Sequence, residues 1–368
     1  MSVPESYGAE PAARPPWTTY LGFGLLVVAV AGGVAFATAP SPYVVERPGP
    51  VYDTLGEVDD ADGSEVPLID IPDETTYPTS GRLDLLTVYL TGSRENPLSW
   101  IDVAAAWFDP SRTVLPIDAV YPSGQTEEEA DQESAVQMDT SQQDAVAAAL
   151  TELDIPFGSV LTIADVIEGE PADGVLEAGD AILTADGEPV TDVDQLRAVL
   201  DDAGVGTTVA MGIRRGEDEL TVRLAPVASD SDGSPVIGVY AASTYDFPFD
   251  VNIRLQNVGG PSAGMMFALG IYDKLTPGEL TGGEHIAGTG TIGGSGEVGA
   301  IGGIVQKMYG AQGAGADWFL APTANCSEVV GHIPAGLEVF SVATLDDAID
   351  AVEAIGSGDT AGLARCER

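Results

Sequence analysis

Two glycine-rich motifs constrain this chain more than any other feature. They read Asn257-Val-Gly-Gly-Pro-Ser-Ala-Gly264 and Ala300-Ile-Gly-Gly-Ile-Val-Gln-Lys307. Before the first motif, Val251, Ile253 and Leu255 alternate with polar residues, which predicts a half-buried strand. After it, the apolar run over residues 265–272 has the length of a helix. The first motif therefore predicts a tight turn that opens a buried helix.

Ser262 is expected in the first turn of that helix, because Pro261 suits the first helical position, where no N–H is needed. Free backbone N–H groups and the positive end of the helix dipole gather there and would stabilise a developing oxyanion. The backbone N–H groups of Ser262 and Ala263 are the candidates for an oxyanion hole. Neighbours such as Gly259 and Gly264 are expected to keep side chains away from a substrate. The simpler alternative is a helix cap.

Lys307 stands in the second motif, in an apparent helix that continues to residue 311 among apolar neighbours. A lysine desolvated in this way has a depressed pKa and can act as a general base. An average lysine is a solvated surface charge, but this chain has only two lysines, Lys274 and Lys307, among its 14 basic residues. The two motifs together predict a serine-lysine pair.

At these residues the sequence resembles the Lon protease family, and more narrowly its membrane-anchored, PDZ-containing bacterial branch. The Lon-like pattern is present in order at residues 260–264, 289–290 and 301–307. The resemblance implies that Ser262 is a nucleophile, Lys307 its base and Thr289 a hydroxyl that orients the lysine. It also implies that substrates are polypeptides, and it allows a homo-oligomer, since Lon-like domains often form hexamers. Departures from the family pattern, which bear on substrate preference, are Gly259, Thr291, Val305 and Gln306.

Residues 155–228 resemble a PDZ domain of the bacterial type, with strands expected at 160–163, 207–214 and 219–224 and a helix at 193–202. Such a domain accepts an extended peptide as an added strand. Phe157-Gly158, before the first strand, resembles the carboxylate-binding loop, although the same residues also suit an ordinary turn. The domain is expected to recruit substrates or gate the protease, and a purely structural insertion is the alternative.

Residues 20–39 carry no charge and have the length of a transmembrane helix. The alternative is a cleaved signal peptide, but its apolar stretch usually covers only about 7–15 residues. We expect a retained anchor, with residues 1–19 as a short cytoplasmic tail and the rest outside the cytoplasm. The protein would then sit in the cell membrane by a single pass.

The remaining residues complete an α+β plan. Residues 40–154 are expected to form an extracytoplasmic α/β region without a catalytic set, residues 236–356 the Lon-like domain and residues 357–368 a loose tail. The two cysteines, Cys326 and Cys366, would pair outside the cytosol or remain free thiols.

Composition excludes several functions. A net charge of -44 would repel nucleic acid and anionic surfaces. Neither lysine is followed by serine or threonine, as an ATP phosphate-binding loop requires. His285 and His332 fit neither a trypsin-like triad nor a zinc-peptidase motif, so no metal or cofactor is expected.

The sequence thus favours an ATP-independent, membrane-tethered serine endopeptidase that cleaves unfolded or flexible proteins. The alternative is a non-catalytic membrane adaptor in which peptide binding by the PDZ domain is the whole activity.

Overall fold

The structure, a computed structural model, describes residues 17–60, 63–121, 126–229, 233–255 and 258–367. The described residues form both helices and strands, which confirms the predicted α+β class. The chain divides into two compact units, one made of residues 1–45 and 90–123 and the other of residues 46–89 and 124–368. Of the predicted tail, residues 1–16 lie outside the described residues, and residues 17–19 belong to the first helix.

The first unit contains the long apolar helix α1 (Trp17–Thr38). Its span Tyr20–Thr38 has a mean hydropathy of 2.2, and it is long and apolar enough to cross a membrane by length and composition. The same unit holds α2 (Trp100–Trp107), β6 (Thr113–Pro116) and α3 (Ile117–Val120). The start of α2 is fixed by a capping box between Ser99 and Asp102.

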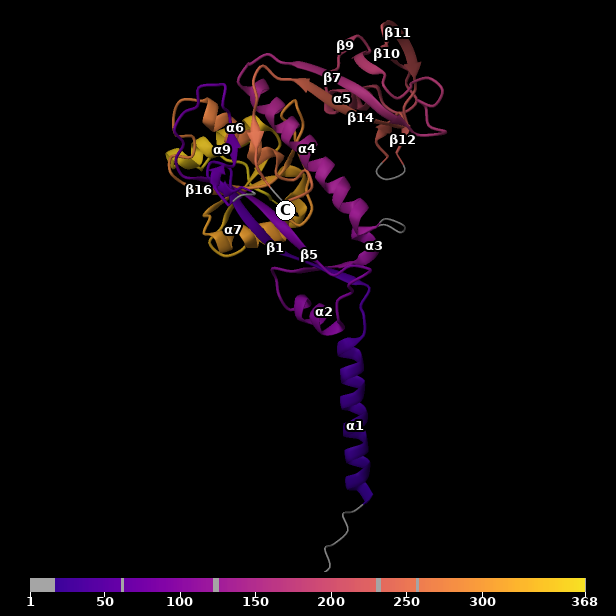
Figure 1. The fold of residues 1–368 in the computed structure, drawn as a ribbon, viewed down its shortest axis with the longest axis vertical. Coiled ribbons are helices and arrows are strands. Elements are labelled where there is room, and N and C mark those ends of the chain that lie inside the picture. The colour runs from indigo at the N-terminus through magenta and orange to yellow at the C-terminus, as the bar shows by residue number, and fades with distance from the viewer. Residues whose placement is uncertain (1–16, 61–62, 122–125, 230–232, 256–257, 368) are drawn as a thin grey trace, which may run out of the picture. The chain divides into compact units, whose positions relative to one another are not determined.

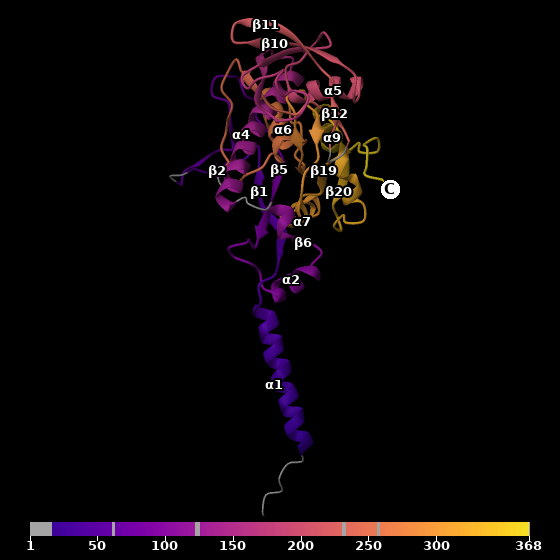
Figure 2. The ribbon, with the colours of Figure 1, turned by 90° about the vertical axis from the view of Figure 1, so that its right-hand side faces the viewer.

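The main sheet of the second unit runs in the order β20, β19, β16, β5, β1. β16 pairs in parallel with both β5 and β19, and β19 pairs in parallel with β20. Figure 2 shows β19 and β20 beside α9. The bounds of these strands are β1 (Tyr43–Asp53), β5 (Arg82–Thr91), β16 (His285–Gly288), β19 (Trp318–Pro322) and β20 (Glu338–Val342).

Short two-stranded pairs surround this sheet. They are formed by β2 (Glu57–Asp59) with β3 (Glu65–Pro67), β4 (Ile69–Asp70) with β15 (Asn252–Ile253), and β17 (Thr291–Ile292) with β18 (Val298–Gly299). The strand expected around Val251, Ile253 and Leu255 is therefore only two residues long. Its length is limited because its partner β4 offers only two residues for pairing.

The helix α6 (Gly264–Leu275) lies at the centre of the largest apolar core. Its first eight residues are all buried, as expected of a helix that is apolar on every side. α4 (Glu127–Glu152) packs along α6 with its C-terminal, alanine-rich half and begins with a capping box of Thr126 and Glu129. The other helices of this region are α7 (Ile304–Ala314), the 3-10 turn η1 (Thr323–Asn325), α8 (Cys326–Val329) and α9 (Leu345–Ser357).

The PDZ-like segment has a core of its own. Its sheet has the order β11, β10, β8, β7, β14, with β9 beside β8 and the helix α5 (Val193–Ala203) packed on it (Figure 1). The strands expected from the sequence are present, but the sheet also includes β14, which lies in the range assigned to the proteolytic region. The bounds of its strands are β7 (Gly158–Val166), β8 (Ala181–Ala185), β9 (Glu188–Pro189), β10 (Val209–Arg215), β11 (Asp218–Leu224) and β14 (Val239–Asp246). β12 (Val227–Ala228) and β13 (Pro235–Val236) form a separate two-stranded pair.

Candidate active site

Ser262 lies in a turn before α6 and not in its first helical turn, so that expectation was wrong. The helix begins at Gly264, with Ala263 as its N-cap. The reason is a set of contacts with the β16–β17 connection: the Ser262 carbonyl accepts hydrogen bonds from the Gly290 N–H (3.0 Å) and the Thr289 hydroxyl (2.8 Å). The Ser262 carbonyl accepts these two hydrogen bonds in place of one from an N–H group of the helix.

The glycines around Ser262 are explained by packing against α4 and β17. A Cβ on Gly259 would lie 2.7 Å from Cβ of Ser134, and one on Gly264 would lie 2.8 Å from Ile292. The Gly260 N–H donates to the Ser134 carbonyl over 2.8 Å. At Gly259 and Gly264 the glycines thus let helix and loop approach each other closely, a role that the sequence did not indicate. The predicted clearance for a substrate stays a prediction.

Lys307 is positioned by α7, which starts after Gly303 in the left-handed region (φ 68°). A glycine is suited to that conformation because it has no Cβ. Lys307 is 2% exposed, and its Nζ lies 2.7 Å from Ser262 Oγ and 2.9 Å from Thr289 Oγ1. The structure thus brings together the three side chains singled out in the sequence, from two helix starts and one strand end.

Burial lowers the pKa of Lys307 from 10.5 to about 7. The cause is desolvation, because a charged ammonium loses its hydration in the interior. A neutral amine has a lone pair, and at 2.7 Å that lone pair can accept the proton of the Ser262 hydroxyl. Thr289 accepts one N–H of Lys307 while donating to the Ser262 carbonyl, so the amine is held in one orientation.

Glu46 is an acidic group near this site that the sequence analysis did not single out. Its charge raises the pKa of Lys307, opposing the desolvation. Desolvation raises the pKa of Glu46 itself, and the nearby charge of Lys307 lowers it. The residue follows an apolar pair, Val44 and Val45, on β1, and no motif of the sequence links it to a lysine that lies far along the chain.

A pocket of about 460 Å³ opens onto Ser262 and Lys307. Its lining includes Met138 from α4, residues 86–89 of β5, and Gly302 before α7. The candidate oxyanion residues Ser262 and Ala263 both line it. Met138 was not predicted as a site residue, because its position on an acidic helix gives no sign of the pocket. The arrangement offers a hydroxyl and a base beside a space that can admit a peptide bond.

Residues 256–354 match the family model of the Lon protease (S16) C-terminal proteolytic domain. Residues 256–354 are a Lon-type proteolytic domain. Residues 135–225 match the family model of the PDZ domain, so both domain types expected from the sequence are present. The Lon-type domain is a serine-peptidase domain, and its match includes Ser262, Thr289 and Lys307.

A curated protein and several solved structures are similar to parts of this chain. The chain is 29% identical over 107 residues to Lon protease 2 of Bacillus subtilis (strain 168), which covers 28% of this chain and 19% of that protein. The chain thus spans about a fifth of the length of this relative. Among solved structures, the PDZ domain of an SdrC-like protein from Listeria monocytogenes is 27% identical, at a TM-score of 0.21, covering 22% of this chain and 85% of that one. The corresponding domain from Listeria innocua is 28% identical at the same TM-score, with 22% and 92% covered.

The PDZ domain has a strand on each side of β7. One edge of β7 pairs with β8 and the other pairs with β14 of the same chain. Phe157 packs its ring against Tyr245 and Phe247, at centroid distances of 5.9 and 5.5 Å. Gly158 pairs with Asp246. The two residues compared with a carboxylate-binding loop therefore contact a segment of this chain.

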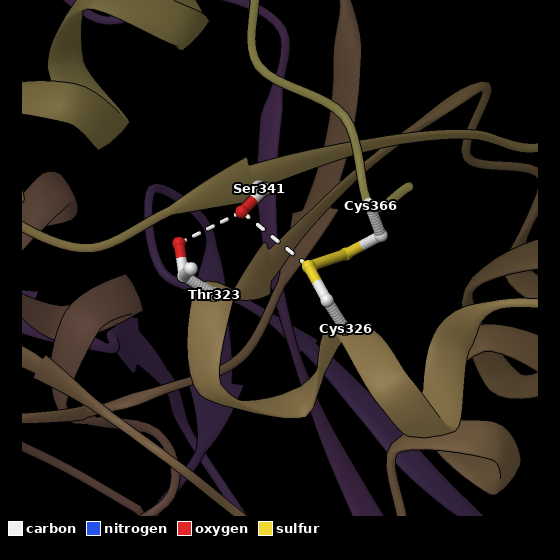
Figure 3. Close-up of a disulfide and its surroundings, with 4 residues drawn as sticks. All are labelled: Thr323, Cys326, Ser341 and Cys366. Atoms are coloured by element: carbon white, nitrogen blue, oxygen red, sulfur yellow. Dashed lines mark hydrogen bonds between the residues drawn. A yellow bond between two sulfur atoms is a disulfide. The ribbon is translucent and has the colours of Figure 1, made fainter. Parts of the chain in front are cut away.

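Cys326 and Cys366 form a disulfide that ties the C-terminal segment to α8 within the second unit (Figure 3). Ser341 Oγ lies 3.5 Å from Cys326 Sγ and 2.7 Å from Thr323 Oγ1. The segment that was predicted to be a loose tail, residues 357–368, is described as far as residue 367. The disulfide at Cys366 links it to α8.

The histidines have local partners. His285 Nε2 lies 2.6 Å from the fully buried carboxylate of Asp84, and His332 Nδ1 lies 2.9 Å from the Glu328 carbonyl. Within the described residues, no cluster of three or more metal-ligating side chains occurs.

Proposed function

We propose that this chain is an ATP-independent, membrane-tethered serine endopeptidase in which Ser262 is the nucleophile and Lys307 the general base. The observation that carries the proposal is the 2.7 Å separation between Lys307 Nζ and Ser262 Oγ, in a Lon-type domain and beside a pocket. Thr289 supports the pair as a positioning residue, since it contacts the amine and the Ser262 carbonyl.

The proposed reaction has two halves. Ser262 Oγ attacks the substrate carbonyl while its proton passes to Lys307, and Lys307 then gives the proton to the leaving amine. Water hydrolyses the resulting ester with Lys307 again as base. The backbone N–H groups of Ser262 and Ala263 are the proposed donors to the oxyanion, because both residues line the pocket just before α6.

Membrane attachment is supported by α1, whose span of 19 residues is apolar and 0% buried. The disulfide supports an extracytoplasmic position for the catalytic part, because disulfides persist in oxidising compartments.

Substrates are proposed to be unfolded or flexible polypeptides. Neither lysine of the sequence stands in a Gly-Lys-Ser/Thr phosphate-binding loop, which supports hydrolysis without ATP.

The test is proteolysis of a permanently unfolded protein by the full chain in detergent micelles, without ATP. Ser262→Ala and Lys307→Ala are expected to abolish turnover. Ser295→Ala and Lys274→Ala are matched controls, because Ser295 is an exposed serine of the same domain and Lys274 is the other lysine. Both controls are expected to keep activity. Equal turnover in all five proteins would contradict the proposed pair, and absence of turnover in all five would favour the adaptor function.

A further inference from the structure

The strand β14 lies along the free edge of the PDZ sheet. It pairs antiparallel with β7 over its whole length, from Val239 opposite Val166 to Asp246 opposite Gly158. β7 has β8 on its other side, so β14 takes the edge at which an added strand would pair (Figure 1). α5 also contacts β14. An extended peptide bound by such a domain makes the same type of contact, with backbone pairing on one strand.

The two faces of β14 are distinct. Val239, Ala241, Ser243 and Tyr245 are half-buried, and the residues between them are exposed. Val239 and Ala241 pack against the apolar core of the PDZ domain. An extended peptide bound in such a groove shows the same alternation, because every second side chain points into the groove and contacts it.

The end of β14 lies at the segment compared with a carboxylate-binding loop. A Cβ on Gly158 would lie 3.2 Å from Cβ of Asp246, so the glycine permits the close approach of the two strands. Next to this pair, the ring of Tyr245 stacks on Phe247, which follows the strand, at 5.4 Å. The Tyr245 hydroxyl donates to Asp144 on α4 over 2.8 Å. The segment therefore passes through the site and continues, as an internal stretch of a ligand would.

Most of the PDZ core is formed by residues outside β14. The family match for the PDZ domain ends at residue 225, before β14 begins. The fully buried residues of the PDZ core come from positions 161–237, and β14 contributes only partly buried ones. Small side chains such as Ala241 and Ser243 bury little apolar area, so most of the affinity of this contact comes from backbone pairing. Another extended segment can supply the same backbone pairing.

We propose that β14 is an internal occupant of the PDZ peptide groove, and that the groove exchanges it for an extended polypeptide segment of another molecule. The favoured ligand has small side chains at the positions of Ala241 and Ser243 and a tyrosine at the position of Tyr245. It needs no free carboxyl terminus, because β14 itself binds as an internal stretch.

The test uses a fluorescent peptide with the sequence of residues 238–247, and full-length protein that carries Ser262→Ala so that the peptide is not cleaved. Ala241→Asp places a charge on the inward face of β14 and should weaken the binding of β14 to β7 and the PDZ core. Ala242→Asp makes the same change on the exposed face and is the matched control. The tethered strand competes at a high effective concentration, so its release is expected to tighten peptide binding at least tenfold in Ala241→Asp and to leave Ala242→Asp unchanged.

Equal peptide affinity in the Ser262→Ala protein and in the same protein with Ala241→Asp or Ala242→Asp would overturn the proposal. A second measurement does not depend on the folding of a variant: hydrogen exchange of the Ser262→Ala chain with excess peptide. We expect faster exchange of β14 amides while β7 stays protected, and no effect from a peptide of scrambled order. Unchanged protection of β14 with the peptide bound, or no binding at millimolar peptide, would also overturn the proposal. These readouts do not require peptidase activity.

Discussion

Thr289 Oγ1 lies 2.9 Å from Lys307 Nζ and donates its own hydrogen to the Ser262 carbonyl. With one hydroxyl, Thr289 therefore fixes the amine relative to the backbone of the residue that the amine is proposed to activate. The side chain is 1% exposed, so water cannot easily replace either contact.

Removing this hydroxyl should impair the reaction more than substrate binding. Thr289→Val keeps the shape but removes one hydrogen-bond partner from the Lys307 amine and one from the Ser262 carbonyl, at a cost of about 1–3 kcal/mol. We expect kcat to fall about ten- to hundredfold with KM nearly unchanged. Thr289→Ser keeps a hydroxyl and is expected to retain most of the activity. A loss of equal size in both variants would indicate a packing role only.

The pH dependence of hydrolysis follows from the lowered pKa of Lys307. Below about pH 7 the amine is protonated and cannot accept the serine proton. Activity is therefore expected to rise as the pH increases through about 7 and then to level off. The measurement is kcat/KM between pH 5 and 9, with substrate charge held constant. A value of kcat/KM that still rises steeply at pH 9, without levelling off, would contradict the lowered pKa that burial implies.

Glu46 offers a way to move that midpoint. Its negative charge raises the pKa of Lys307, so Glu46→Gln should lower the pKa of the lysine further. We expect the rise of kcat/KM to shift to lower pH, with the variant more active than the unmodified chain at pH 6. Glu57→Gln changes an exposed glutamate and serves as the control. A shift to higher pH, or the same shift in the control, would refute the electrostatic role of Glu46.

The disulfide is expected to stabilise the second unit. Removing both sulfurs with Cys326→Ala and Cys366→Ala should lower the free energy of unfolding by about 2–4 kcal/mol, because the unfolded chain regains the freedom that the link removes. Denaturant unfolding followed by circular dichroism measures this change. Reduction of the unmodified protein should lower the midpoint similarly. An unchanged midpoint in both experiments would show that the link contributes nothing to stability.

Much of the fold could be predicted because its signals are local. The alternation within β7, β10 and β11 and the helical run of α6 are set by neighbouring residues. The glycine motifs also indicated Ser262 and Lys307 as a pair, although the distance between them depends on how the whole chain folds.

Contacts between distant segments were harder to predict. No local sequence pattern indicated that residues 239–246 form the strand β14 or that its partner is β7. The start of α6 was misplaced because Gly290 and Thr289, far along the chain, hold the Ser262 carbonyl. Glu46 and Met138 were missed for the same reason: each reaches the site by tertiary packing and not by a local motif.

The most direct test of the account is the site and pH dependence of covalent labelling by a serine-reactive fluorophosphonate, followed by mass spectrometry of the full chain. We predict one label per chain, on Ser262, at a rate that rises with pH through about 7. The label should be lost in Lys307→Ala and retained in Lys274→Ala. Labelling of Ser262 at the same rate in Lys307→Ala, or labelling of another serine, would contradict the claim that a neutral Lys307 activates Ser262.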